Sequence, residues 1–170
     1  VIENVSGSDK YRTVIFFDPP ETEKGIRRWL GRGDVKYEPQ SGNSIGERMS
    51  DAFERVFSGG AGKAVLIGTD VPGITEETVA EAFRLLEFED AAIGPAEDGG
   101  YYLLGLKKPQ SLLFDDMEWG SDIVYKRTVE RMEKLDLGYK SLDTLRDVDT
   151  AEDNGPELFK WLTDGTKIRN

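Results

Sequence analysis

Short apolar runs along the chain predict buried strands. Residues 13–17 (Thr-Val-Ile-Phe-Phe) and 63–67 (Lys-Ala-Val-Leu-Ile) are rich in β-branched or aromatic side chains and are too short for helices. Such runs are typical of strands that are covered on both faces of a parallel sheet. Weaker patterns predict further strands at residues 35–37, 91–95, 101–106 and 139–142.

Amphipathic segments between these runs predict helices. In residues 44–57 the apolar side chains recur at helical spacing, and Ser44 with Glu47 fits a capping box. Thr75 and Ser121 are expected to cap two later helices. Because strands alternate with helices, we predict an α/β domain with a mostly parallel sheet. The predicted helices cover residues 22–30, 44–57, 75–87, 121–135 and 156–162.

Length and composition limit the number of domains and the kinds of reaction and ligand that we expect. The chain has 170 residues, the usual size of one domain, so we expect a single domain over residues 1–170. Lys and Arg total 22 against 33 Asp and Glu, and the net charge of −11 disfavours nucleic-acid binding. The sequence has no Cys and no His, which excludes disulfides, thiolate nucleophiles, Ser-His-Asp triads and conventional zinc sites. A bound metal would therefore be a hard cation such as Mg²⁺ or Mn²⁺.

The sequence also bears on location. No segment approaches the roughly 18 apolar residues needed to span a bilayer, and the first residues lack the basic-then-apolar pattern of a signal peptide. We therefore expect a cytoplasmic protein.

Asp70 is the first candidate for chemistry. It follows the predicted strand at 63–67 and precedes a Pro-Gly turn, and ligands of parallel sheets bind beyond the carboxyl ends of the strands. A carboxylate there is well placed to hold a metal or a phosphate-bound cation. The alternative is that Asp70 only caps the turn by bonding its own backbone.

Two further segments carry candidate carboxylates, each with a purely structural alternative. In residues 97–101 (Glu-Asp-Gly-Gly-Tyr) the glycines would let a ligand approach while Asp98 accepts bonds from its hydroxyls, but Asp-Gly is also a hairpin signal. Asp147 and Asp149 alternate, so both point to one side, where a metal or Arg146 would relieve their repulsion. They could equally form a solvated turn before the last helix.

Five segments in order resemble one known family. They are residues 40–53, 68–73 (Gly-Thr-Asp-Val-Pro-Gly), 94–106, 119–122 (Trp-Gly-Ser-Asp) and 145–153. Together they are similar to an uncharacterised family of GT-A-like transferases, described as glycosyltransferases associated with radical-SAM or selenium-related proteins. The wider superfamily includes molybdenum-cofactor and phospholactate guanylyltransferases. The resemblance implies a three-layer α/β/α nucleotide-diphospho-sugar transferase fold.

The resemblance also implies roles for individual residues. Asp70 and Asp149 would bind Mg²⁺ or Mn²⁺, which bridges to the phosphates of a nucleotide. Asp98 or Asp122 would orient or deprotonate an acceptor hydroxyl. The remaining residues of the implied nucleotide and acceptor site are Gln40, Gly46, Thr69, Gly99, Gly100 and Trp119, the last of which could equally be a buried aromatic.

The first residues depart from the family pattern. Family members begin with an apolar strand and a basic Pro-Gly-Lys-Thr-Arg-like loop that should hold the nucleotide phosphates. Here the chain opens at Val1, and residues 1–5 read like the end of a helix. We therefore expect the N-terminal strand to be missing because the sequence is partial.

These observations lead to one main hypothesis and three alternatives. The main one is a metal-dependent transferase that moves a glycosyl group from a nucleotide sugar to a small-molecule acceptor. The alternatives are a nucleotidyltransferase that uses a nucleoside triphosphate and a small phosphorylated acceptor, a two-carboxylate glycosidase, and a degenerate binding domain. The oligomeric state stays open, a homodimer included.

Overall fold

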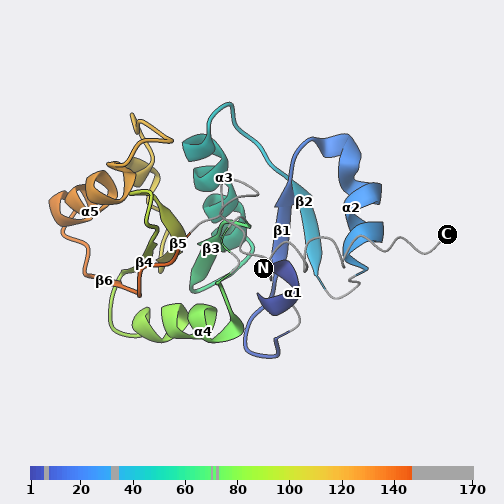
Figure 1. Ribbon diagram of the computed structural model, residues 1–170, viewed down its shortest axis with the longest axis horizontal. Coiled ribbons are helices and arrows are strands. Elements are labelled where there is room, and N and C mark those ends of the chain that lie inside the picture. The colour runs from blue at the N-terminus through green and yellow to red at the C-terminus, as the bar shows by residue number, and fades with distance from the viewer. Residues whose placement is uncertain (6–7, 32–34, 70, 72, 147–170) are drawn as a thin grey trace.

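The computed structural model describes residues 1–5, 8–31, 35–69, 71 and 73–146 (Figure 1). Strands and helices alternate through this part of the chain. The strands are β1 (Val14–Phe17), β2 (Lys36–Pro39), β3 (Ala64–Ile67), β4 (Ala91–Pro95), β5 (Tyr101–Leu106) and β6 (Tyr139–Ser141). The helices are α1 (Ile2–Val5), η1 (Pro20–Thr22), α2 (Glu23–Leu30), α3 (Ile45–Ser58), α4 (Glu76–Leu85), η2 (Ser111–Leu113) and α5 (Val124–Lys134).

The strands form two sheets. The larger sheet has the order β3-β5-β4-β6, and the smaller one pairs β1 with β2 in parallel. In the larger sheet β4 and β6 are parallel, while β5 lies antiparallel between β3 and β4. Residues 96–100 are too short for a crossover, so β5 returns beside β4 as the second strand of a hairpin. The remaining three strands of this sheet run in one direction.

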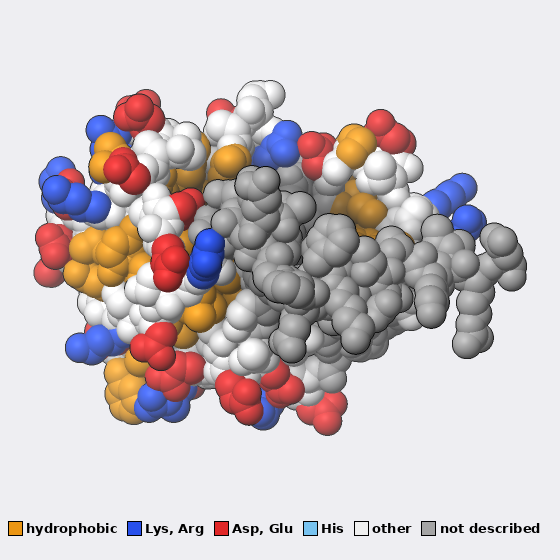
Figure 2. All heavy atoms as spheres, in the orientation of Figure 1, with side chains coloured by type: hydrophobic (Ala, Val, Ile, Leu, Met, Phe, Trp, Pro, Cys, Tyr) orange, Lys and Arg blue, Asp and Glu red, His pale blue; other side chains and the backbone are white. Residues whose placement is uncertain are grey.

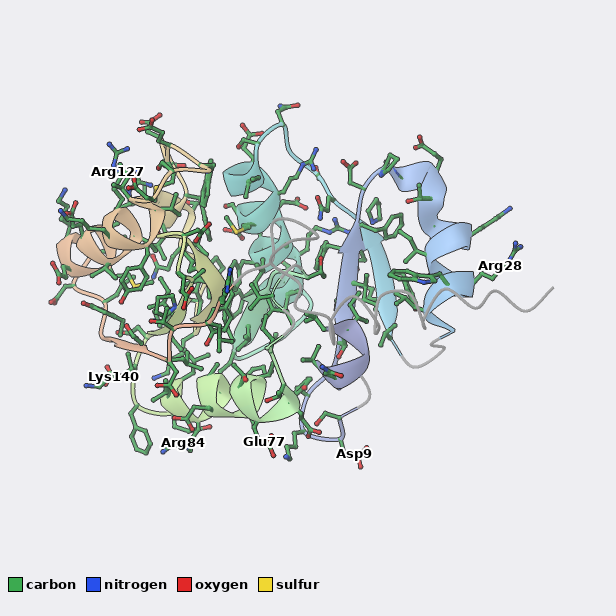
Figure 3. All side chains as sticks on the ribbon, viewed as in Figure 1. Asp9, Arg28, Glu77, Arg84, Arg127 and Lys140 are labelled. Atoms are coloured by element: carbon green, nitrogen blue, oxygen red, sulfur yellow. The ribbon has the colours of Figure 1, made fainter. Side chains whose placement is uncertain are left out.

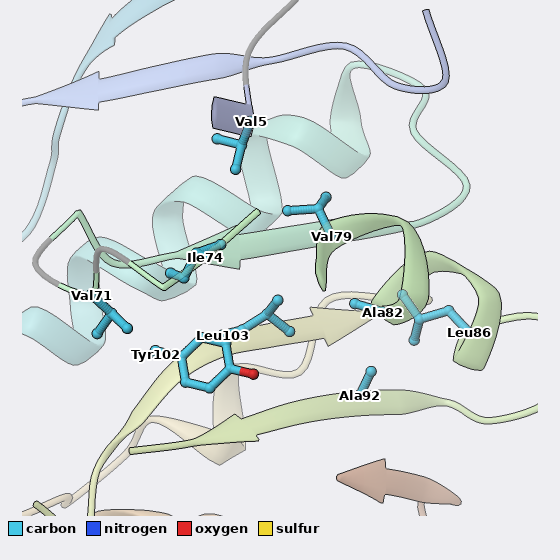
Figure 4. Close-up of a cluster of buried hydrophobic side chains, with 9 residues drawn as sticks. All are labelled: Val5, Val71, Ile74, Val79, Ala82, Leu86, Ala92, Tyr102 and Leu103. Carbon is cyan, nitrogen blue, oxygen red and sulfur yellow. The ribbon is translucent and has the colours of Figure 1, made fainter. Parts of the chain in front are cut away.

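Helices cover both faces of the larger sheet and make three layers. On one face Val79 and Ala82 of α4 belong to the same buried cluster as Ala92 of β4 and Leu103 of β5 (Figure 4). A second cluster joins α3 and α5 to the other face and contains Phe53, Ala91, Ile93, Leu104, Leu106 and Met132. The alternation of Ala91, Ala92 and Ile93 between the two clusters follows from the two-residue period of a strand.

Helix α3 connects the larger sheet to the smaller one. Phe53 is buried against the larger sheet, while Arg55 reaches the smaller sheet. Arg55 forms an ion pair with Glu38 and donates a hydrogen bond to the Pro39 carbonyl at 2.8 Å. Its guanidinium also lies 5.1 Å from the centroid of the Phe16 ring, within the range of a cation–π contact. One arginine thus contacts both strands of the small sheet.

Most of the predicted helix starts are confirmed. The Ser44 hydroxyl accepts the Glu47 N–H at 3.1 Å, and Thr75 caps α4. The prediction for Ser121 is wrong, because α5 begins at Val124 and the Ser121 hydroxyl donates instead to the Glu118 carbonyl at 2.6 Å. The predicted helix at 156–162 lies outside the described residues. Within the described ranges, none of the helices has the length and apolar character required to cross a membrane.

The role of Arg55 predicts a measurable loss of stability. Replacing Arg55→Met keeps the length of the side chain but removes one cation from the half-buried Glu38, which retains its ion pair with Lys36. We expect the free energy of unfolding to fall by roughly 1–2 kcal/mol, near the lower end for hydrogen bonds to charged groups because the Arg55 side chain is partly exposed. Chemical denaturation followed by circular dichroism measures this change.

Arg84→Met is the matched control. Arg84 pairs with Glu81 within α4 and lies on the outer surface (Figure 3). Exposed pairs of this kind contribute little, so the control should unfold at nearly the wild-type denaturant concentration. Equal effects of the two substitutions would contradict the role that we assign to Arg55.

Candidate functional site

A cavity of about 260 Å³ lies beside the hairpin that joins β4 to β5. Its wall combines the first turns of α3, the end of β3, the start of β5 and the segment before α5. Three of the residues predicted for the site line it, namely Asp98, Gly100 and Trp119. The structure therefore brings together segments that are far apart in the sequence.

The hairpin turn holds Asp98 in place. Asp98 Oδ1 accepts the Gly100 N–H at 2.7 Å, and the Ala96 N–H donates to the Gly100 carbonyl at 3.1 Å. This geometry confirms the turn interpretation of residues 97–101. The Asp98 side chain is nevertheless exposed and lines the cavity, where a ligand could reach it. Its predicted role in binding a ligand stays a prediction.

Gly99 joins this turn to the start of α5. Its φ of +88° is in the left-handed region, and a Cβ at this position would overlap the carbonyl of Asp122. The Gly99 carbonyl accepts the Tyr125 N–H at 2.9 Å, which ties the turn to the first turn of α5. Asp122 is exposed and comes close to the hairpin through this backbone contact.

Gly46 and Tyr101 position the Trp119 indole. A Cβ on Gly46 would lie 2.9 Å from Trp119 Nε1 and 2.9 Å from the Phe114 carbonyl, so no side chain fits there. Trp119 also contacts the Tyr101 ring edge to face, with ring centroids 6.4 Å apart. Gly46 is buried, whereas Trp119 is half-buried and lines the cavity.

Burial raises the pKa of Tyr101 above its ordinary value. The phenol is therefore neutral at any physiological pH. Tyr101 supplies the cavity with an aromatic wall and a hydroxyl that lies 3.9 Å from Met49 Sδ. It adds no charge to the site.

Gln40 lies in a different polar group, at the end of β2. Its Oε1 accepts a bond from Arg48 at 3.2 Å, and Arg48 also pairs with Asp18 at 3.1 Å and donates to the Gly42 carbonyl at 3.1 Å. Asp18 and Arg48 were not among the residues predicted for the site. The available signals were the position of Asp18 after the first strand and of Arg48 in the first turns of a helix. Neither signal shows that the two side chains meet.

The remaining predicted residues have no described contacts in the site. Thr69 is exposed and follows β3, next to Gly68, which lines the cavity. Asp70 and Asp149, the predicted metal ligands, lie outside the described residues. Within the described ranges no three acidic side chains gather in a way that could hold a metal ion. The metal site at Asp70 and Asp149 therefore stays a prediction.

The close contact at Gly99 predicts that adding a methyl group at this position lowers stability. Gly99→Ala forces a positive φ on a residue with a Cβ and drives that atom into the Asp122 backbone. We expect a loss of unfolding free energy of about 3 kcal/mol, of which about 1–2 kcal/mol comes from the left-handed backbone alone. Denaturant unfolding of the variant gives this value.

Gly60→Ala separates the cost of the left-handed backbone from the cost of the clash with Asp122. Gly60 has a nearly identical φ of +92°, but nothing lies within 4 Å of the position of its Cβ. This variant should show the backbone cost without the clash. If both variants lose the same free energy, the Asp122 contact is not what fixes the turn.

The contact at Gly46 predicts a change in the environment of Trp119. Gly46→Ala should shift the fluorescence of Trp119, measured in a Trp29→Phe, Trp161→Phe background where it is the remaining tryptophan. We also expect lower stability, although alanine ordinarily stabilises a helix by about 1 kcal/mol relative to glycine. Gly25→Ala is the control, because nothing lies within 4 Å of a Cβ there, so it should raise stability and leave Trp119 emission unchanged. An unshifted Trp119 spectrum in Gly46→Ala would contradict the packing described here.

Solved structures share this architecture. A protein from Desulfovibrio desulfuricans G20, provisionally described as a nucleotide-diphospho-sugar transferase, matches with a TM-score of 0.82 at 35% identity. The match covers 88% of this chain and 65% of that chain, so this chain spans less than two thirds of its relative. A 4-diphosphocytidyl-2C-methyl-D-erythritol synthase from Anaerococcus prevotii DSM 20548 has a TM-score of 0.61 at 12% identity, over 89% of this chain and 79% of that chain. The predicted three-layer nucleotide-diphospho-sugar transferase fold is confirmed.

A family profile accounts for most of the sequence. No protein with a curated description matches the chain significantly. The profile described as "Uncharacterized protein conserved in bacteria (DUF2064)" matches residues 1–121, well over half of the 170 residues. The chain therefore belongs to the DUF2064 family.

Proposed function

We propose that this chain is part of a transferase that moves a glycosyl group from a nucleotide sugar to a hydroxyl of a small acceptor. The observation that carries the proposal is the cavity that Asp98 and Trp119 both line, beside the hairpin of a nucleotide-diphospho-sugar transferase fold. An aromatic ring beside a carboxylate suits an acceptor with an apolar face and a hydroxyl. The similarity to the Desulfovibrio protein supports a nucleotide-activated donor.

In the proposed reaction, the acceptor oxygen attacks the anomeric carbon of the donor. A new carbon–oxygen bond forms as the bond to the donor diphosphate breaks, and the nucleoside diphosphate leaves. The proton of the acceptor passes to a carboxylate, Asp98 or Asp122, which both lie at the junction of the hairpin and α5. Trp119 would hold the acceptor against this junction.

The donor phosphates require positive charge. The chain has a net charge of −11, and acidic and basic side chains are dispersed over the visible face of the molecule (Figure 2). We propose that Asp70 and Asp149 hold Mg²⁺ or Mn²⁺, which would neutralise phosphate charge when bound. The group formed by Gln40 and Arg48, together with Thr69, is our candidate for contacts to the nucleotide.

Nucleotidyl transfer is the second candidate. The Anaerococcus synthase shares the fold, and the fold alone does not separate the two reactions. The products do, because glycosyl transfer releases a nucleoside diphosphate from a nucleotide sugar, whereas nucleotidyl transfer releases diphosphate from a nucleoside triphosphate. Identifying the released product therefore distinguishes the two reactions.

The proposal predicts metal-dependent nucleotide binding by the full-length protein. A ligand that binds the folded state at 100 times its Kd stabilises that state by about 2.7 kcal/mol and raises Tm. We expect one nucleotide or nucleotide sugar to raise Tm in the presence of Mn²⁺ and to have little effect with EDTA. A thermal-shift panel of uridine, guanosine, cytidine and adenosine nucleotides measures this response.

Two variants test the metal ligands. Asp70→Asn should abolish the Mn²⁺-dependent part of the shift, whereas Asp115→Asn, at an exposed aspartate outside the cavity wall, should retain it. A panel without any nucleotide response would refute the transferase. A full response in Asp70→Asn would refute the role of that carboxylate.

A further inference from the structure

The cavity has apolar walls. Ile45 and Met49 of α3, Leu66 of β3, and Val71 and Val124 line it together with the Trp119 ring. Burial of apolar ligand surface against such walls is favourable, by about 25 cal/mol per Å² removed from water. The part of a ligand that enters must therefore present an apolar face.

Asp98 is the one charged side chain among the described residues of the wall. Its Oδ1 is engaged by the Gly100 N–H, while Oδ2 has no bonding partner within the described part of the chain. Oδ2 is thus placed to accept a bond from a hydroxyl or an ammonium group of the ligand. Its charge repels an anion.

Two described arginines of α3 and α5, the helices that contribute to the cavity wall, are held by other groups. Arg48 is paired with Asp18, and Arg131 donates to the Leu113 carbonyl at 3.0 Å and to the Asp116 carbonyl at 3.2 Å. Neither arginine belongs to the cavity wall. A phosphate in the cavity would therefore lack a cation from these residues.

Helix starts commonly bind phosphate through free N–H groups, and here one such N–H at each of two helices has an internal acceptor. At α5 the Tyr125 N–H donates to the Gly99 carbonyl at 2.9 Å. At α3 the Glu47 N–H donates to the Ser44 hydroxyl, and the Glu47 carboxylate accepts the Asn43 N–H at 2.7 Å. A carboxylate thus already lies at the start of α3.

We propose that this cavity selects an acceptor whose entering part has an apolar face and a hydroxyl or amine, and that it rejects phosphorylated acceptors. The inference rests on the proposed transferase and names the substrate class of its cavity. It separates the two candidate reactions further, because the nucleotidyltransferase alternative needs a small phosphorylated acceptor.

The test uses three probes that share one aromatic group and differ in charge. They are 2-phenylethylamine, 2-phenylethanol and 2-phenylethyl phosphate, titrated against the full-length protein by ligand-observed NMR. We expect the amine to bind at least about ten times more tightly than the phosphate, since a charge-assisted hydrogen bond is worth more than a tenfold change in Kd. The alcohol should lie between them. Equal or tighter binding of the phosphate, or no binding of any probe, overturns the proposal.

Asp98→Asn tests the carboxylate without disturbing the turn, because the amide oxygen can still accept the Gly100 N–H. This variant should bring the amine and the phosphate within about threefold of each other. Trp119→Phe should weaken all three probes by a similar factor, and Trp29→Phe, at an exposed tryptophan of α2, is its matched control. An unchanged preference in Asp98→Asn rejects the role of Asp98 as the selecting group.

The two proposals fail in distinguishable ways. A protein with the expected probe preference but no nucleotide response refutes the transferase and leaves the cavity selective for uncharged and cationic groups. A protein that binds a nucleotide with Mn²⁺ but prefers the phosphate probe refutes the cavity assignment alone.

Discussion

The attachment of α3 to both sheets is the constraint on which the rest of the structure depends. The helix buries Phe53 against the larger sheet and presents Arg48 and Arg55 to the smaller sheet. Its first turns also supply Ile45 and Met49 to the cavity. An apolar contact therefore fixes the helix, and charged contacts orient the small sheet around it. Any rotation of α3 would disturb both sheets and the cavity together.

The site is built from backbone contacts more than from reactive side chains. Gly99 lets the hairpin touch the Asp122 backbone, and Gly46 lets Trp119 pack directly on α3. These approaches bring Asp98 and an aromatic ring to the same opening, although each residue has an ordinary structural role. The chemistry that we propose follows from this juxtaposition. A carboxylate with one committed oxygen beside an indole suits a neutral or cationic acceptor.

Sequence patterns predicted most helices and strands well, because each of these elements is determined mainly by residues that are close together in the sequence. The apolar run at 63–67 and the Ser44 cap depend on nearby residues, and the structure confirms both. The prediction that Ser121 caps a helix is wrong because its hydroxyl donates to the Glu118 carbonyl, a bond between residues that are just as close in sequence. The motifs pointed to Asp98 and Trp119 as members of one site, but contacts such as those of Arg48 with Asp18 join distant segments. No periodicity encodes such contacts.

The turn at Asp98 has a consequence for how specificity could change during evolution. The turn needs only a side-chain oxygen at this position, which aspartate and asparagine both provide. Gly46 and Gly99, in contrast, have no room for any side chain. The charge of the cavity can therefore change by a single substitution while its shape is maintained. New acceptors would be gained through electrostatic preference before the pocket itself was remodelled.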